Sequence, residues 1–104
     1  MSEQIFRTRK TRNFTTVANE FICDPRLSAK AKGILLYLLS KPDDWETKLV
    51  DIVNHMADGL DSIRSGIKEL KNRGHIIQRS VRDEKGRITH WEFTVFEIPF
   101  EVLS

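Results

Sequence analysis

The hydrophobic positions of residues 47–74 predict two short amphipathic helices joined by a tight turn. Apolar residues recur at intervals of three and four in each half, as Leu49, Ile52, Val53 and Met56 and then Ile63, Ile67 and Leu70. We expect Asp58 to cap the second helix, Gly59 to permit the change of direction and Gly74 to end that helix. The second helix then keeps one polar face free.

Residues 28–40 carry a broader hydrophobic stripe, which predicts the central buried helix of a core. Its members are Ala31, Ile34, Leu35, Leu38 and Leu39. Ser28 is the expected N-cap, and Gly33 inside the helix suggests a close approach by another element. Residues 14–17 are β-branched and aromatic and predict a short strand, and Trp45 is expected to pack over an edge of the core.

Two further strands are predicted over residues 75–82 and 87–97, with residues 83–86 as the turn of a hairpin. Trp91, Phe93 and Val95 alternate in the second strand, which favours core packing of these aromatic rings over a surface that stacks single-stranded bases. The whole order predicts an α+β fold of the winged helix-turn-helix type. It has three helices, a C-terminal β-hairpin wing and a short N-terminal strand.

Composition indicates one globular domain, because the 104 residues are 39% hydrophobic and 31% charged. A single cysteine excludes an internal disulfide, and the absence of a long apolar run or a signal-peptide pattern predicts a cytoplasmic protein without a membrane partner. The three histidines and Cys23 lack metal-ligand spacing, and the carboxylate pairs stand where helix caps are expected. We therefore expect no enzyme activity, no cofactor and no metal.

Charge is segregated along the chain although the net charge is only +2. Residues 1–13 carry +3, residues 14–63 carry −3, residues 64–87 carry +5 and residues 88–104 carry −3. This distribution suggests a localised basic surface for DNA, while charge alone fits equally well the alternative that lysine and arginine only solvate exposed faces. We expect a flexible basic arm over residues 1–13 and a winged-helix DNA-binding domain over residues 14–104.

Three groups of side chains are predicted to contact DNA. The recognition helix supplies Ser62, Arg64, Ser65, Lys68, Lys71 and Asn72. The wing supplies Arg79, Arg82, Lys85 and Arg87. The arm supplies Arg7, Arg9, Lys10 and Arg12. Ser62, Arg64 and Ser65 are expected to meet base edges, whereas Lys68, Lys71, Arg82 and Lys85 are expected to contact phosphates.

Three segments also carry a resemblance: LSAKAKGILLYLLSKPDDW at residues 27–45, DGLDSIRSGIKELKNRGHI at 58–76 and RDEKGRITHWEFTVFE at 82–97. In this order they resemble the N-terminal winged-helix domain of phage and plasmid replisome organisers, the DnaD-like replication-initiation proteins. The resemblance implies DNA binding, recruitment of a helicase or its loader, and self-association. Family members usually add a C-terminal helical domain that these residues do not include, so a stand-alone regulator or a piece of a longer protein fits equally well.

Three functions follow as alternatives. The first is duplex DNA binding in replication initiation of a phage, plasmid or other mobile element, and the second is transcription regulation of such an element. The third is a winged helix that serves only as a protein-interaction module. Four residues near the C-terminus are expected either to cover an edge of the core or to form a homodimer contact: Phe96, Ile98, Phe100 and Val102.

Overall fold

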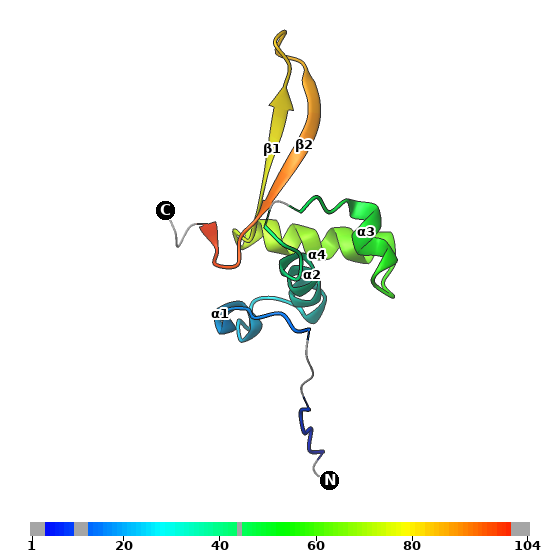
Figure 1. Cartoon of the computed structure of the whole chain (residues 1–104), viewed down its shortest axis with the longest axis vertical. Coiled ribbons are helices and arrows are strands. Elements are labelled where there is room, and N and C mark those ends of the chain that lie inside the picture. The colour runs from blue at the N-terminus through cyan, green and yellow to red at the C-terminus, as the bar shows by residue number, and fades with distance from the viewer. Residues whose placement is uncertain (1–3, 10–12, 44, 101–104) are drawn as a thin grey trace.

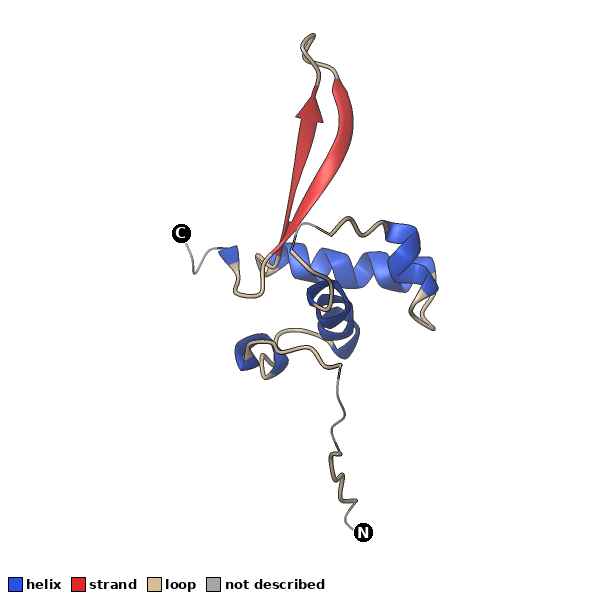
Figure 2. Ribbon diagram, in the orientation of Figure 1, coloured by secondary structure: helices blue, strands red, loops and turns tan. Residues whose placement is uncertain are grey.

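The computed structural model describes residues 4–9, 13–43 and 45–100. Within these ranges the order is α1 (Asn19–Ile22), α2 (Ala29–Leu39), α3 (Leu49–Asn54), α4 (Leu60–Asn72), β1 (Ile76–Arg82) and β2 (Ile88–Val95) (Figure 1; Figure 2). The predicted α+β winged helix-turn-helix is confirmed, with α3 and α4 as the helix pair and the antiparallel hairpin as the wing. None of the helices in the described ranges is long and apolar enough to cross a membrane.

Helix α2 lies at the centre of the core, as its hydrophobic stripe predicts. Ser28 is its N-cap, and the Ser28 side-chain oxygen accepts a hydrogen bond from the Ala31 N–H at 3.2 Å. Ala31, Ile34 and Leu35 are buried, and Ser40 is the C-cap. The sequence pattern therefore placed this helix and both of its ends correctly.

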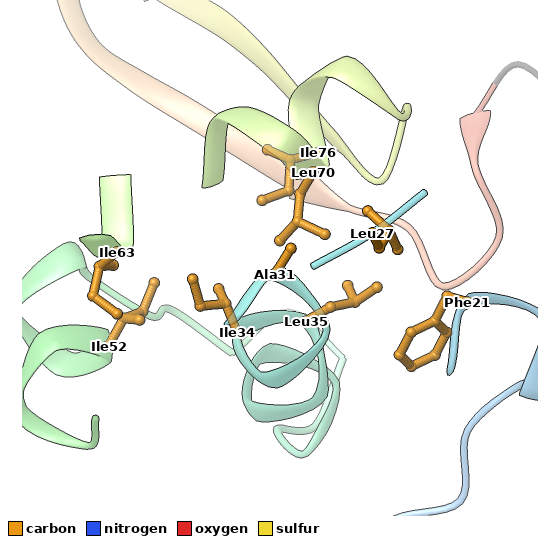
Figure 3. Packing of buried hydrophobic residues seen from close by; sticks show 9 residues of the cluster. All are labelled: Phe21, Leu27, Ala31, Ile34, Leu35, Ile52, Ile63, Leu70 and Ile76. Atoms are coloured by element: carbon orange, nitrogen blue, oxygen red, sulfur yellow. The ribbon is translucent and has the colours of Figure 1, made fainter. Parts of the chain in front are cut away.

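The hydrophobic core joins residues from all four helices, the segment before α2 and the base of the wing (Figure 3). Its buried members are Phe21, Leu27, Ala31, Ile34, Leu35, Ile52, Ile63, Leu70 and Ile76. Burying one large aliphatic or aromatic side chain contributes about 1.5–3 kcal/mol. This cluster fixes α4 on α2 and includes the first residue of the wing, Ile76, with Val95 packed against it.

The close approach between helices occurs at Gly66 of α4 and not at Gly33 of α2. A Cβ atom on Gly66 would lie 2.5 Å from Cδ1 of Ile34 and 3.8 Å from Cα of Ala31. A Cβ atom on Gly33 would meet nothing within 4 Å. The expectation for Gly33 is wrong because that residue lies on a part of α2 that no other element contacts closely.

The start of α4 also differs from the sequence expectation. Gly59 is the N-cap with an ordinary φ of −76°, and no side chain caps the helix. Asp58 stands one residue too early for that role. Its carboxylate instead accepts a hydrogen bond from the Ser62 hydroxyl at 3.1 Å.

The end of α4 confirms the role predicted for Gly74. This residue has φ of +82°, and its N–H donates to the Lys71 carbonyl at 3.1 Å. The next N–H, from His75, donates to the Leu70 carbonyl at 2.9 Å. The two bonds complete a Schellman motif, which ends α4 sharply and sends the chain into β1.

The short strand predicted for residues 14–17 does not form. The described residues contain only a two-stranded sheet, and Phe14 is 79% exposed. Extended backbone needs a neighbouring strand to receive its hydrogen bonds, and this segment has none. The chain instead turns into α1, where the Ala18 N–H donates to the Glu97 carboxylate at 3.2 Å.

The wing is a long hairpin that stands away from the helices (Figure 1). Ile76 pairs with Val95 at its base and Arg82 pairs with Ile88 near its tip, with an irregularity between Val81 and Arg82. The predicted turn is present, and Gly86 has the left-handed φ of +80° that it requires. Because the strands extend beyond the core, most of their side chains are exposed on both faces.

This geometry overturns the expectation that the wing aromatic residues pack into the core. Trp91 and Phe93 are 52% and 50% exposed, and Val95 alone of the alternating set is half-buried beside the core. Trp45, expected over the core edge, is 60% exposed. Alternation identifies which residues share a face, but it does not show that another element covers that face.

The residues after β2 return to the junction of α4 and β1. The Phe96 N–H donates to the His75 carbonyl at 2.7 Å, and the Phe100 N–H donates to the Gly74 carbonyl at 2.9 Å. The Phe96 and Phe100 ring centroids lie 5.4 Å apart. These contacts agree with a cover over this edge of the fold, while Val102 lies outside the described residues and the homodimer contact stays a prediction.

Candidate nucleic-acid interface

The outward face of α4 combines cations and small polar side chains. Helix α4 packs on α2 through Ile63, Gly66 and Leu70, which leaves Arg64, Ser65, Lys68 and Asn72 exposed. Within the described ranges, neither Arg64 nor Lys68 forms an ion pair. Their charges are therefore available to an anionic ligand.

Three other predicted residues of α4 already have partners. The Ser62 hydroxyl donates to Asp58, and the Ser65 hydroxyl accepts a hydrogen bond from the Lys30 ammonium at 3.1 Å. The Lys71 ammonium donates to the Gln78 side-chain oxygen at 2.7 Å and lies 5.0 Å from the Phe93 ring centroid. Lys71 thus joins α4 to the wing, a contact that the one-dimensional pattern did not reveal.

Two wing cations are paired with carboxylates. Arg79 contacts Glu92 at 3.1 Å across the two strands, and its hydrogen bond holds the pKa of Glu92 below the ordinary value. Arg87 contacts Asp83 at 3.2 Å, and the Arg87 backbone N–H is the main cause that lowers the pKa of Asp83. These pairs reduce the positive potential of the strands because each cation faces an ionised carboxylate.

The other two wing cations, at the turn, form no ion pair with any residue that the structure describes. Arg82 donates from Nη1 to the Gly86 carbonyl at 2.8 Å, which orients its guanidinium without neutralising it. The Lys85 side chain is exposed beside it. The strongest phosphate contacts of the wing are therefore expected at its tip.

The predicted arm lies apart from these two surfaces. Arg7 and Arg9 are exposed on a segment at the opposite end of the molecule from the wing tip (Figure 1). Lys10 and Arg12 fall outside the described residues. The structure thus brings the recognition helix and the wing together and leaves the arm separate.

A groove of about 920 Å³ runs between the wing base, α4 and the segment that connects α2 to α3. Arg64, Lys68 and Lys71 line it, together with the exposed aromatic rings of Trp45 and Phe93. The sequence predicts both rings against the core and does not reveal them as surface residues. Trp45 lies outside any hydrophobic period, whereas Phe93 follows the alternation of its strand.

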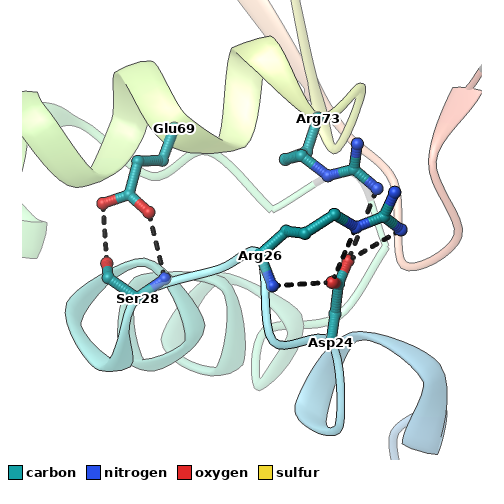
Figure 4. A network of polar contacts seen from close by, with 5 residues as sticks. All are labelled: Asp24, Arg26, Ser28, Glu69 and Arg73. Atoms are coloured by element: carbon teal, nitrogen blue, oxygen red, sulfur yellow. Dashed lines mark hydrogen bonds and ion pairs between the residues drawn. The ribbon is translucent and has the colours of Figure 1, made fainter.

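A polar network fixes how α4 is presented (Figure 4). The Glu69 carboxylate accepts hydrogen bonds from the Ser28 hydroxyl at 2.6 Å and from the Ser28 N–H at 3.0 Å. These bonds lower the pKa of Glu69. Glu69 therefore caps the start of α2 from its place on α4, which links the two helix orientations.

The second half of the network surrounds Asp24 (Figure 4). Asp24 accepts hydrogen bonds from the Arg26 N–H at 2.9 Å and the Arg26 side chain at 3.0 Å, and Arg73 approaches at 3.5 Å. The Arg26 hydrogen bonds lower the pKa of Asp24 to about 2. This cluster ties the loop before α2 to the last turn of α4.

The helix pair, the basic outward face of α4 and the hairpin define a winged helix-turn-helix. A family described as a helix-turn-helix domain matches residues 26–76, from the loop before α2 to the first residue of β1. This match suggests DNA binding by the segment that holds α4. No curated protein and no solved structure matches the chain. The finer resemblance to replisome organisers stays a prediction.

Proposed function

We propose that the protein binds duplex DNA with α4 in the major groove and the wing along the adjacent backbone. The observation that carries this proposal is the shared surface of the two elements. Arg64 and Lys68 of α4 line the same groove as the wing residues Thr94 and Val95, and Lys71 of α4 donates a hydrogen bond to Gln78 of the wing. Helix and wing can therefore face one duplex together.

The length of the wing suits this arrangement. Six residue steps separate Ile76 from Arg82, which corresponds to about 20 Å along the strand. A major groove is about 12 Å wide, so a wing rooted beside α4 reaches past the groove edge to the sugar-phosphate backbone. We assign phosphate contacts to Lys68, Arg82 and Lys85 and base contact to Arg64.

The proposal is tested by the fluorescence anisotropy of labelled duplex at several salt concentrations. The three assigned phosphate contacts should give a log-log slope of affinity against salt of roughly −3, and contacts from the arm would make it steeper. Lys32 of α2 lies outside the groove, so Lys32→Glu serves as a control with the same charge change as Lys68→Glu. No measurable duplex binding at low salt would refute duplex DNA binding and favour the protein-interaction module over both duplex-binding roles.

We further propose that the DNA binding serves replication initiation of a phage, plasmid or other mobile element. The resemblance of three ordered segments to DnaD-like winged-helix domains supports this role, and it implies a helicase or its loader as partner. Footprinting across the element that carries the gene would test it. Protection where replication begins supports initiation, whereas protection of a promoter with altered transcription supports the regulator instead.

A further inference from the structure

One face of the wing carries exposed aromatic rings. Trp91 and Phe93 are separated by one residue in β2 and therefore project from the same face, together with their cross-strand partners Ser80 and Gln78. Both rings are about half exposed. The side chains opposite them are small or polar, so the rings are not enclosed by larger neighbours across the hairpin.

The other face of the wing mixes polar side chains with the aliphatic residues Ile77 and Val81. It carries the Arg79–Glu92 ion pair, and the His90 ring lies 3.3 Å from the same glutamate. A wing that needed aromatic residues only for β-propensity would have no reason to segregate them. The segregation leaves one face suited to planar apolar groups.

Cations are placed around the aromatic face. Phe93 lines the groove with Arg64, Lys68 and Lys71, and the Lys71 ammonium lies 5.0 Å from its ring centroid. The exposed ring of Trp45 lines the same groove. Among the described residues of this lining, Asp43 is the one carboxylate and the cations outnumber it.

We propose that this face binds single-stranded DNA, with unpaired bases stacked on Trp91 and Phe93 and phosphates held by Arg64, Lys68 and Lys71. Aromatic rings beside a cationic track are the features that hold unpaired strands without sequence preference. Residues two apart in a strand are about 6.8 Å apart, which leaves room for a base on each ring. An apolar protein partner would have to desolvate four cations of the described lining, Lys41, Arg64, Lys68 and Lys71.

This inference goes beyond the duplex binding proposed above and shares with it the cations of α4. The aromatic residues should contribute to single-stranded DNA binding and not to duplex binding, because bases inside an intact duplex are already stacked on one another. Single-stranded binding should therefore depend on Trp91 and Phe93, whereas duplex binding should not.

Tryptophan fluorescence provides a direct probe. The chain has two tryptophans, so Trp45→Phe leaves Trp91 as the only one and keeps an aromatic ring in the groove. Adding oligothymidylate should quench and shift this emission as bases stack on the indole. An abasic oligonucleotide of the same length carries the same phosphates without bases, and it should produce no comparable quenching.

Affinities of variants test the energetics by anisotropy with the full chain. Trp91→Ala and Phe93→Ala should each weaken oligothymidylate binding by about 5- to 150-fold and leave duplex affinity within about twofold. Ile77→Ala is the matched control, because Ile77 lies on the opposite face of the wing and is 37% exposed. Thermal unfolding of each variant, with Phe93→Leu as a milder change, separates loss of stacking from loss of folding.

Several results would overturn the inference. Equal affinity for the abasic and thymidylate strands would show that only phosphates are bound. An equal loss of duplex and single-strand affinity in the aromatic variants would show that the rings support the wing or contact duplex. Conversion of a dimer to a monomer by Trp91→Ala with unchanged single-strand affinity would assign the face to a second copy. Failure of duplex binding alone would refute the earlier proposal and not this one.

Discussion

The arginines of α4 and the wing have different roles, because some are paired with carboxylates and others are not. Arg79 and Arg87 face carboxylates, so their charges are largely used within the wing. Arg64 lines the groove without an ion pair in the described ranges, and Arg82 bonds only to a neutral carbonyl. Charge counting along the chain treated all four alike, and the structure separates them.

Substitutions at Lys68, Arg82 and Arg64 test whether these cations contact phosphates or bases. Lys68→Glu and Arg82→Glu should each weaken binding on every duplex and reduce the magnitude of the salt slope by about one or more, because each removes a phosphate contact. Arg64→Ala should cost about 1–3 kcal/mol on the preferred sequence and relax the preference. Anisotropy on a panel of duplexes measures both effects. An equal loss on all sequences for Arg64→Ala would reassign Arg64 to the backbone.

The contact at Gly66 predicts a coupled stability effect. Gly66→Ala places a methyl group against Cδ1 of Ile34, and overpacking of this kind costs about 1–3 kcal/mol. Ile34→Val deletes that Cδ1 atom, so in this background the same alanine should stabilise through its better helix propensity, by up to about 1 kcal/mol. Urea unfolding of the four proteins gives the coupling energy.

Gly33→Ala is the control for that cycle. Its Cβ would meet open space, so the substitution should stabilise α2 by roughly 0.5–1 kcal/mol in either background. Additive effects of Gly66→Ala and Ile34→Val would show that the two helices have room to separate.

At the scale of elements, α2 and α4 are joined by contacts that serve both helices at once. Glu69 of α4 accepts both donors of Ser28 at the start of α2, and Gly66 lets the two backbones approach. Asp24 then connects the preceding loop to Arg73 at the end of α4. The orientation of the recognition helix is therefore set by polar contacts as well as by the core.

Acid should weaken this junction in a defined pH window. The folded chain holds the pKa of Asp24 at about 2, below its ordinary value of 3.8, so its contribution is complete above pH 3.8 and is lost as pH falls through about 2. Thermal unfolding followed by circular dichroism should show a shallower dependence on pH between 4 and 2 for Asp24→Asn than for the wild type. Matching slopes for the two proteins would show that Asp24 makes no net contribution to folding.

The elements that sequence reasoning placed correctly are those whose signals are local. The stripe and cap of α2 lie within one segment, and the end of α4 at Gly74 follows from one residue's backbone freedom. Gly66 and Glu69 were missed as contact residues because their partners lie about 30 to 40 positions away. The exposure of Trp91 was missed because the hairpin extends beyond the hydrophobic core. The pattern of either strand alone does not show how far it extends.

The outward face of α4 shows the same contrast between local sequence signals and contacts with distant residues. Its outward side chains could be predicted, because the hydrophobic period of α4 identifies the face left free. The hydrogen bonds that some of them form could not be predicted, because the partners come from other elements. Lys30 of α2 bonds to Ser65, and Gln78 of β1 bonds to Lys71. Periodicity specifies faces, whereas partners depend on tertiary packing.

At the scale of the molecule, the basic arm and the wing tip lie at opposite ends (Figure 1). Thirteen extended residues span at most about 45 Å, and the longest dimension is 64 Å. An arm that contacts the same duplex as α4 must therefore swing from its position here. Its cations can supply affinity without contributing to the fold, because the Arg7 and Arg9 side chains are exposed.

Removal of residues 1–13 tests this separation. The shortened chain should keep the thermal midpoint of the full chain, because the described arm residues are exposed. It should bind every duplex more weakly by a similar factor, with a less steep salt slope, since four cations are lost. An unchanged slope would show that the arm contributes no phosphate contact.

The hydrogen bonds between Glu69 and Ser28 also bear on whether the protein or the DNA changes conformation when their shapes are not complementary. Tilting α4 to follow a distorted groove would break the two hydrogen bonds between Glu69 and Ser28, so we expect the protein to resist this change in the proposed complex. The duplex must then supply the adjustment, and pyrimidine–purine steps bend most readily. Preference among sites should consequently track the flexibility of base steps that no side chain touches.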